Sequence, residues 1–238
     1  MKIIRNENSF TITGFKKKRA YDYKKYTRND NDGPRTYNVD NNKVPSVTSI
    51  LSATQSEEKK ESLNKWRQRI GYAEATRITN QAATRGTEMH YVLEQYMNGI
   101  AYLNLRKNGH LPRMMAHTIV NNLDDLSEVY GTEVSLAYED QWAGSTDLVC
   151  KYDEKTTIAD FKQSNKPKRK EWIEDYFLQI AAYSLAHKKQ YGDIQQGAIL
   201  ICTKDLLFQK FIMDKNMLKM YEDLWLERVD KFFSLQVS

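Results

Sequence analysis

The segment STDLVCKYDEKTTIADFK, residues 145–162, contains two runs of alternating apolar and polar residues joined by the acidic pair Asp153–Glu154. Alternation of this kind predicts two β-strands, and the short charged break between them predicts a hairpin. In the second run Asp160 and Lys162 are two positions apart, so they face the same side of the strand. Neither side chain helps to form an apolar core, which indicates that this face of the hairpin carries chemistry.

The two strands of this hairpin bring a second carboxylate close to the first. Pairing that is symmetric about Asp153–Glu154 places Asp147 directly opposite Asp160, with their Cβ atoms roughly 5 Å apart. Two like charges at such range repel each other by roughly 1 to 4 kcal/mol, and a shared divalent cation would offset that cost. Carboxylate oxygens suit magnesium or manganese. The alternative is an exposed hairpin in which both acids are hydrated.

Three residues outside the hairpin are expected to approach the same place. Glu133 lies in the preceding strand-like run, and Gly144 permits a tight entry into the strand that bears Asp147. His90, in RGTEMHYVLE, is expected in the first turn of a helix, where its ring could be a further metal ligand. A lone histidine is more often a surface residue or a hydrogen-bonding group at a helix end, and only the neighbouring motifs favour a ligand.

The remainder of the chain predicts one α/β domain, with a mixed sheet flanked by helices and a helical N-terminal half. The stretch 27–42, TRNDNDGPRTYNVDNN, is rich in turn-forming residues and predicts an irregular loop. Helices are expected from Ser46, over 57–80, from Gly86–Thr87 to Asn98–Gly99, and over 111–126, 170–191 and 216–233. Strands are expected over 132–139, 145–152, 156–162, 197–203 and 206–213.

The helix expected over 170–191 presents two different faces. A polar and aromatic stripe follows helical spacing along one side, and an apolar stripe follows the other side, which we expect to face the core. An aromatic face packed against the sheet is the alternative for the first two members of the polar stripe. The polar stripe contains Trp172, Tyr176, Gln179 and Tyr183, and the apolar stripe contains Ile173, Phe177, Ile180 and Ala181.

Composition excludes several classes of protein. The 238 residues are 40% apolar and 11% aromatic, which is typical of a globular domain. The chain has no apolar run long enough to cross a membrane and its start does not resemble a secretory signal, so we expect a cytoplasmic protein of a bacterium or of a phage-infected host. Its two cysteines, Cys150 and Cys202, are expected to be buried free thiols, and are too few for a structural zinc or iron–sulfur site.

Positive charge is concentrated in three clusters, although the net charge is only +5. Lys16–Arg19, Lys24–Lys25 and Lys166–Lys170 suit a polyanionic partner, and ordinary solvated surface is the alternative. Tyrosines at 21, 23 and 26 flank the second cluster and are candidates for stacking on unpaired bases, unless this segment is a solvated edge strand.

Five segments, taken in order, resemble the motifs of the RecB-like branch of the PD-(D/E)XK nucleases. They are GTEMH (86–90), Glu133, GSTD (144–147), DFK (160–162) and QIAAY (179–183). Within that branch the chain is most similar to the mitochondrial genome maintenance exonuclease family and its phage and bacterial relatives, as VPSVTSILS (44–52) and LNKWRQRI (63–70) indicate. The likeness covers roughly residues 44–233. Gln163 departs from the pattern, since Thr or Ser is commoner after the lysine.

The resemblance implies a restriction-endonuclease-like core in a single nuclease domain over residues 44–238, with a helical part over 44–130 and the catalytic sheet and helices over 131–238. Residues 1–43 would be an N-terminal extension whose role stays open. The resemblance also implies a Mg²⁺ or Mn²⁺ cofactor, with Glu133 beside the metal or bound through water, and Lys162 orienting the attacking water. The implied metal ligands are His90, Asp147, Asp160 and the main-chain carbonyl of Phe161.

The implied substrate is DNA, preferably single-stranded and trimmed from an end, in replication, repair or recombination. Proteins of those processes are the implied partners. Gln179 and Tyr183 would hold the DNA backbone near the metal. Lys166, Lys168, Arg169 and Lys170 would contact successive phosphates. Two alternatives stay open: a structure-selective endonuclease on the same fold, and a DNA-binding recombination module that does not cleave.

Overall fold

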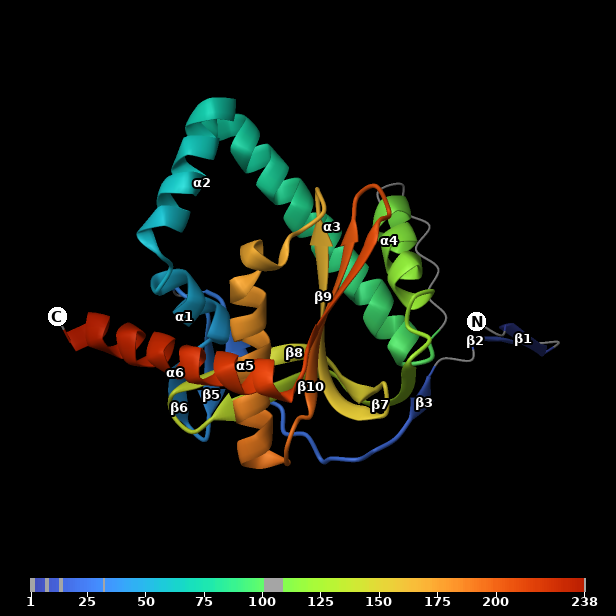
Figure 1. The fold of residues 1–238 in the computed structure, drawn as a ribbon. Helices are drawn as coiled ribbons and strands as arrows, with labels where there is room; N and C mark the ends of the chain where they lie inside the picture. Colours follow the sequence, from blue (N-terminus) through green and yellow to red (C-terminus); the bar gives the residue numbers. More distant parts are fainter. Residues whose placement is uncertain (1–2, 7–8, 13–14, 32, 101–108, 238) are drawn as a thin grey trace.

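A mixed six-stranded sheet flanked by helices forms the body of the protein in the computed structural model, which describes residues 3–6, 9–12, 15–31, 33–100 and 109–237 (Figure 1). The strand order is β11-β10-β9-β8-β7-β3; β10 runs parallel to β9 and β3 parallel to β7, and the other neighbours are antiparallel. The strands are β3 (Lys16–Lys17), β7 (Leu126–Tyr138), β8 (Trp142–Tyr152), β9 (Lys155–Ser164), β10 (Gln196–Thr203) and β11 (Phe208–Met213).

Helices cover both faces of this sheet. One face packs against α1, α5 and α6 through residues such as Val149 and Ile158, and the other packs against α3 and α4 through Leu148 and Ala159. Neighbouring residues of one strand thus enter different cores, as the alternation in the sequence predicts. The helices are α1 (Val47–Ala53), α2 (Glu57–Ile70), α3 (Tyr72–Met97), α4 (His110–Val120), α5 (Glu174–Gln190) and α6 (Lys215–Val237), with a short 3-10 turn, η2, at Lys170–Trp172.

The predicted helix boundary at Gly86–Thr87 is wrong. The chain breaks instead at Gly71, whose φ of 87° suits glycine, and α3 then runs without interruption through Gly86. A Cβ atom at Gly86 would lie 3.3 Å from the Cγ of Gln163, so the missing side chain lets α3 approach β9 closely. His90 therefore lies in the middle of a long helix rather than in its first turn.

The helix α2 lies outside the core, and its Trp66 is only half-buried. Every residue of α2 is at least partly exposed, and Leu63 is 39% exposed. Figure 1 shows α2 and the first half of α3, together residues 57–85, standing away from the sheet as an arch. Ion pairing of Lys59 with Asp175 links the start of this arch to the start of α5.

Residues 27–45 form a small antiparallel sheet instead of the predicted irregular loop. Strands β4 (Thr27–Asn29), β5 (Thr36–Val39) and β6 (Asn42–Pro45) pair in order, and β5 turns into β6 at Asp40–Asn41. Both turn residues have positive φ, 46° and 71°, as a two-residue hairpin turn requires. The buried Tyr37, Val39 and Val44 pack against Ala137 and Ala143 of the main sheet.

The short strands β1 (Ile3–Asn6) and β2 (Ser9–Ile12) pair with each other. Tyr23 packs against His187 and Tyr191, and its hydroxyl lies 3.1 Å from the Nε2 atom of His187, so this ring is part of the fold.

Cys150 and Cys202 are buried free thiols, as predicted. Within the described residues, no helix is both long and apolar enough to cross a membrane.

Candidate active site

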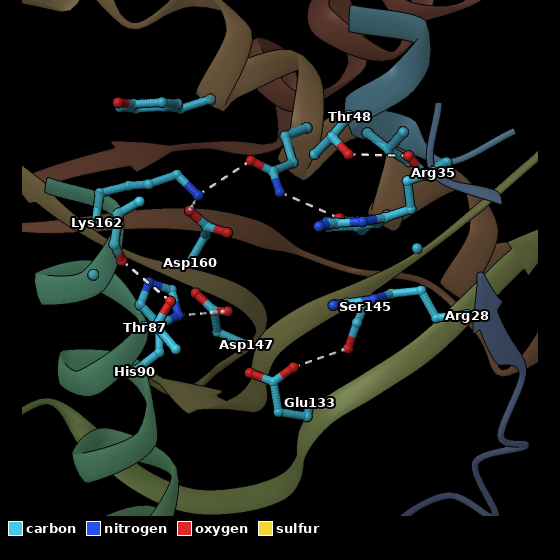
Figure 2. Close-up of a pocket in the computed structure, with 18 of the residues that line it drawn as sticks. Arg28, Arg35, Thr48, Thr87, His90, Glu133, Ser145, Asp147, Asp160 and Lys162 are labelled. Atoms are coloured by element: carbon cyan, nitrogen blue, oxygen red, sulfur yellow. Dashed lines mark hydrogen bonds and ion pairs between the residues drawn. The ribbon is translucent and has the colours of Figure 1, made fainter. Parts of the chain in front are cut away.

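A cleft of about 720 Å³ lies where the arch, the small sheet β4–β6, the main sheet and α5 meet. Several of the residues selected from the sequence line this cleft together, although they come from five different elements (Figure 2). They are His90 from α3, Glu133 from β7, Asp147 from β8, Asp160 and Lys162 from β9, and Gln179 and Tyr183 from α5.

The hairpin β8–β9 has the predicted register, with Leu148 paired to Ala159. Backbone pairing between β8 and β9 is described only as far as this pair. Beyond it, the amide of Phe161 donates its hydrogen bond to the side chain of Asp147. Its Oδ2 atom accepts a hydrogen bond of 2.6 Å from the amide of Phe161, and its Oδ1 atom lies 3.1 Å from Nδ1 of His90. Burial alone would raise the pKa of Asp147, but His90 and the Phe161 amide outweigh burial and hold that pKa below its usual value.

Glu133 faces Asp147 across the neighbouring strand pair, between the pairs Thr132–Leu148 and Val134–Thr146. Its φ of 47° is unusual for a residue with a side chain and costs of order 1–3 kcal/mol. Ser145 donates a hydrogen bond of 3.2 Å to its carboxylate. Glu133 is exposed to the cleft, but the protein atoms around its carboxylate displace part of its water, and with the charge of Asp147 this raises the pKa of Glu133 to about 7. The strand is thus strained at the position where two acids meet.

His90, Glu133 and Asp147 form a group that fits a divalent cation. Each offers one ligand atom, and these atoms lie within 4.8 Å of one another. Ligand bonds of about 2.1 Å place opposite ligands about 4.2 Å apart, so small side-chain movements would bring these atoms into contact with one ion. Carboxylate oxygens suit Mg²⁺ and Mn²⁺ alike, whereas an imidazole nitrogen is a ligand typical of transition metals and so favours Mn²⁺ of the two. The raised pKa of Glu133 indicates a carboxylate whose charge lacks compensation in the protein alone.

The sequence predicts that Asp160 shares a cation with Asp147, but in the structure its partner is Lys162. The buried carboxylate of Asp160 forms an ion pair with Lys162, and burial with the nearby Asp147 raises its pKa to about 6 despite that lysine. At Phe161 the contact with the site is made by the amide, which binds Asp147, rather than by the carbonyl. A metal-ligand role for Asp160 and for the Phe161 carbonyl stays a prediction.

Lys162 is held in place by three groups. Besides Asp160, its ammonium donates a hydrogen bond of 3.2 Å to Oε1 of Gln179 and lies 5.1 Å from the centre of the Tyr176 ring. Burial alone would lower the pKa of Lys162, but Asp160 and Asp147 raise it above its usual value, so the amine stays charged. The cleft therefore contains a fixed cation beside its carboxylates.

The helix α5 supplies much of the predicted polar stripe. Nε2 of Gln179 donates a hydrogen bond of 3.2 Å to the Tyr183 hydroxyl, which extends the contact from Lys162 along the helix. Gly144 is needed for packing: a Cβ atom there would lie 2.6 Å from Cε1 of Tyr183. Trp172 departs from the stripe, because it lies in η2, is 61% exposed and stacks beneath Arg169.

The four basic residues after β9 lie outside the cleft lining. Lys166, Arg169 and Lys170 are exposed, and the backbone amide of the half-buried Lys168 donates to Gln209 at 2.7 Å. Their phosphate role stays a prediction.

Sequence reasoning missed two arginines of the cleft and one contact beside it. Arg28 and Arg35 line it, but the segment that carries them was expected to be an irregular loop. Arg85 hydrogen-bonds the side chains of Gln163 and Asn165 and so ties α3 to the end of β9. The spacing of residues along the chain contains no signal for these long-range contacts.

The amino-acid sequence of this chain is similar to those of curated vertebrate proteins. The chain is 28% identical over 203 residues to the human protein named mitochondrial genome maintenance exonuclease 1, a match that covers 80% of this chain and 58% of that protein. The Xenopus tropicalis protein of the same name is 28% identical over 218 residues, covering 84% and 60%. These matches confirm the resemblance that the motifs indicate. The chain spans about three fifths of the length of these relatives.

The other comparisons add little. No family model matches the chain. Among solved structures, a candidate exonuclease from Eubacterium rectale aligns with a TM-score of 0.45 and 16% sequence identity, covering 66% of this chain and 69% of that one. A likeness of this strength supports no inference about function.

Proposed function

We propose that this chain is a divalent-metal-dependent exonuclease that hydrolyses the phosphodiester bonds of DNA at single-stranded ends, on a PD-(D/E)XK core. The observation that carries the proposal is the group of His90, Glu133 and Asp147, with ligand atoms within 4.8 Å of one another, in one cleft with the charged Lys162. The curated relatives named exonucleases support the same reaction class.

In this proposal the carboxylates and His90 hold the cation. A bound Mg²⁺ or Mn²⁺ would lower the pKa of a coordinated water and offset charge on the transition state. Glu133 and Asp147 would bind it in their ionised forms, and Asp160 would join them by turning from Lys162. The amide of Phe161 fixes the orientation of Asp147. The hydrogen bond from Ser145 holds the Glu133 carboxylate, which is exposed to the cleft.

Lys162 would serve as the protein's own cation at the reacting phosphate. Its ammonium would orient the attacking water and stabilise negative charge on the phosphoryl oxygens, because it stays protonated beside Asp160 and Asp147. The hydrogen bond to Gln179 fixes its direction. Gln179 and Tyr183 offer polar groups on one helix face, suited to holding the DNA backbone next to the metal.

A preference for single strands is supported by the arch. It bears Trp66 and Arg69, which line a hollow of about 770 Å³ on α2, and an aromatic ring beside cations suits unpaired bases. The cleft also extends to the arch, since Ala82 and Ala83 of α3 line it. A strand lying in the cleft would therefore pass close to the arch.

The test uses linear single-stranded and double-stranded DNA, with Mg²⁺, Mn²⁺ or a chelator. We expect metal-dependent shortening of the single strand from an end, and much slower shortening of the duplex. Circular single-stranded DNA separates the alternatives, because an endonuclease cuts the circle and an exonuclease does not. Binding of DNA without cleavage under every metal condition would instead indicate a recombination module and overturn the proposal.

A further inference from the structure

Two arginines lie at the end of the cleft away from Lys162. Arg28 belongs to β4 and Arg35 precedes β5, and both line the cleft together with His90 and Asp147. In the view of Figure 2 the labelled side chains run from Lys162, past Asp147 and Glu133, to Arg28. The carboxylates are thus flanked by cations on both sides, and the proposed reaction uses only Lys162.

A single carboxylate positions both guanidinium groups. Asp30 accepts hydrogen bonds of 2.7 Å from Nε of Arg28 and 2.6 Å from Nε of Arg35. These contacts lower the pKa of Asp30, so it stays ionised. The backbone is fixed as well, because the carbonyl of Arg35 accepts hydrogen bonds from the Ser46 amide at 3.0 Å and the Ser49 hydroxyl at 2.7 Å. The backbone at Arg35 is therefore attached to the start of α1, and Arg28 is linked to Arg35 through Asp30.

The cluster has more hydrogen-bond donors than Asp30 can satisfy. Two guanidinium groups present about ten N–H donors, whereas one carboxylate offers about four acceptor positions. The three side chains together carry one net positive charge and remain 40–51% exposed. Ion pairs this exposed contribute little to stability, about 0–1 kcal/mol, so folding alone does not explain two arginines around one acid. Planar guanidinium groups with unsatisfied donors are suited to phosphate.

We propose that Arg28 and Arg35 form a phosphate-binding subsite that holds a neighbouring phosphate of the same DNA strand, on the side of the carboxylates opposite Lys162. This inference rests on the proposed function, because it treats the cleft as the place where the strand is cut. The ligand is either a phosphodiester within the strand or a phosphate monoester at its end. In either case the pair helps to bind the strand and to fix which phosphodiester bond lies at the metal, and it takes no part in breaking that bond.

The test compares the wild-type protein with Arg28→Ala/Arg35→Ala on internally labelled single-stranded oligonucleotides. We expect KM to rise at least 10-fold while kcat changes less than about 3-fold. Binding is measured in the Lys162→Met background, where the subsite is intact. There the slope of log K against log salt should become shallower by about 0.7, since each phosphate contact on a single strand contributes about 0.7 and the pair holds one phosphate. Oligonucleotides with and without a 5′- or 3′-phosphate distinguish the two ligands.

Loss of a preference for one phosphorylated end would identify a terminal phosphate, and equal losses on all oligonucleotides would identify an internal phosphodiester. Lys219→Ala, which removes an exposed cation paired with Asp223 outside this cleft, is the control and should leave KM unchanged. If the double variant unfolds, two further variants replace it. Adding Asp30→Asn removes the acid that the double substitution leaves unpaired. Arg28→Lys/Arg35→Lys keeps both positive charges but removes the planar guanidinium groups.

Unchanged KM, affinity and salt slope in folded variants would overturn the subsite, even if the wild-type protein cleaves normally. Failure of the wild-type protein to cleave with any metal would instead count against the proposed function, and the binding measurements would still test the arginines.

Discussion

The ammonium of Lys162 is charged although its surroundings are largely protein, because Asp160 and Asp147 offset the cost of burial. Replacing it by methionine keeps most of its volume and removes the charge. We expect Lys162→Met to lower kcat by at least about 100-fold, the usual loss when one stabilising donor is removed. Single-turnover cleavage of end-labelled DNA measures this effect, and circular dichroism checks the fold.

A matched control is Lys189→Ala, which removes an exposed lysine paired with Glu139 and should cleave as the wild-type protein does. Asp160→Ala should be as inactive as Lys162→Met. Cleavage that survives both changes would contradict the site.

The raised pKa of Glu133 predicts how the stability of the metal-free protein depends on pH. Because its pKa is about 7 in the folded state and 4.5 in the reference state, the folded protein binds the proton more tightly. Stability should therefore fall as the pH rises from about 4.5 to 7. The raised pKa values of Asp160 and His90 act in the same direction. Thermal denaturation in chelator at pH 5, 6, 7 and 8 measures the trend.

Glu133→Gln should reduce this slope and raise the melting temperature at pH 8. Mg²⁺ or Mn²⁺ should stabilise the wild-type protein more at pH 8 than at pH 5, because metal binding requires deprotonated ligands. A wild-type melting temperature in chelator that rises between pH 5 and 8 would contradict the environment described for Glu133.

At the scale of elements, the site depends on how closely α5 packs against β8. The Tyr183 ring occupies the space that a side chain at Gly144 would need. We expect Gly144→Ala to cost about 1–3 kcal/mol of unfolding free energy and to lower kcat, because overpacking moves the ring and the Gln179 side chain bonded to it. Denaturant titration and cleavage assays measure the two effects.

Gly197→Ala is the matched control, because a Cβ atom there would lie 2.4 Å from Cγ2 of Ile180 in the core between α5 and β10. It should destabilise the protein to a similar extent while leaving the Lys162–Gln179 contact in place. A Gly144→Ala protein with normal kcat would show that the position of Tyr183 does not matter for cleavage.

For the whole molecule, positive charge near the cleft should govern how DNA binding depends on salt. Lys168 and Arg169 follow the strand that bears Lys162. We expect Lys168→Ala/Arg169→Ala to weaken single-strand binding and to make its salt slope shallower by about 1.4. Fluorescence anisotropy in 50–200 mM salt measures this. Lys188→Ala/Lys189→Ala removes as much charge at the far end of α5 and should leave the slope unchanged; equal slopes in all proteins would rule out the phosphate role.

Much of the sheet was predictable because alternation is a local property. Strands β7 to β11, the capping of α1 by Ser46 and the register Leu148–Ala159 follow from residues close together in the chain. Other features escaped prediction because their causes are distant. Gly86 continues a helix since β9 lies against it, and α2 has an apolar pattern without a core to bury it. The hairpin at Asp40–Asn41 did carry a local signal, which the surrounding polar residues obscured.

The sequence by itself determined which residues are candidates for the chemistry, because carboxylates, a histidine and a lysine in ordered motifs are chemical identities that folding does not change. It also determined that Asp160 and Lys162 share one face, since strand geometry alternates with every residue. Only the tertiary structure decided which acids meet. Glu133 joins His90 and Asp147, Asp160 pairs with Lys162, and Arg28 and Arg35 enter the same cleft. Those contacts join elements far apart in the chain, and packing sets their distances.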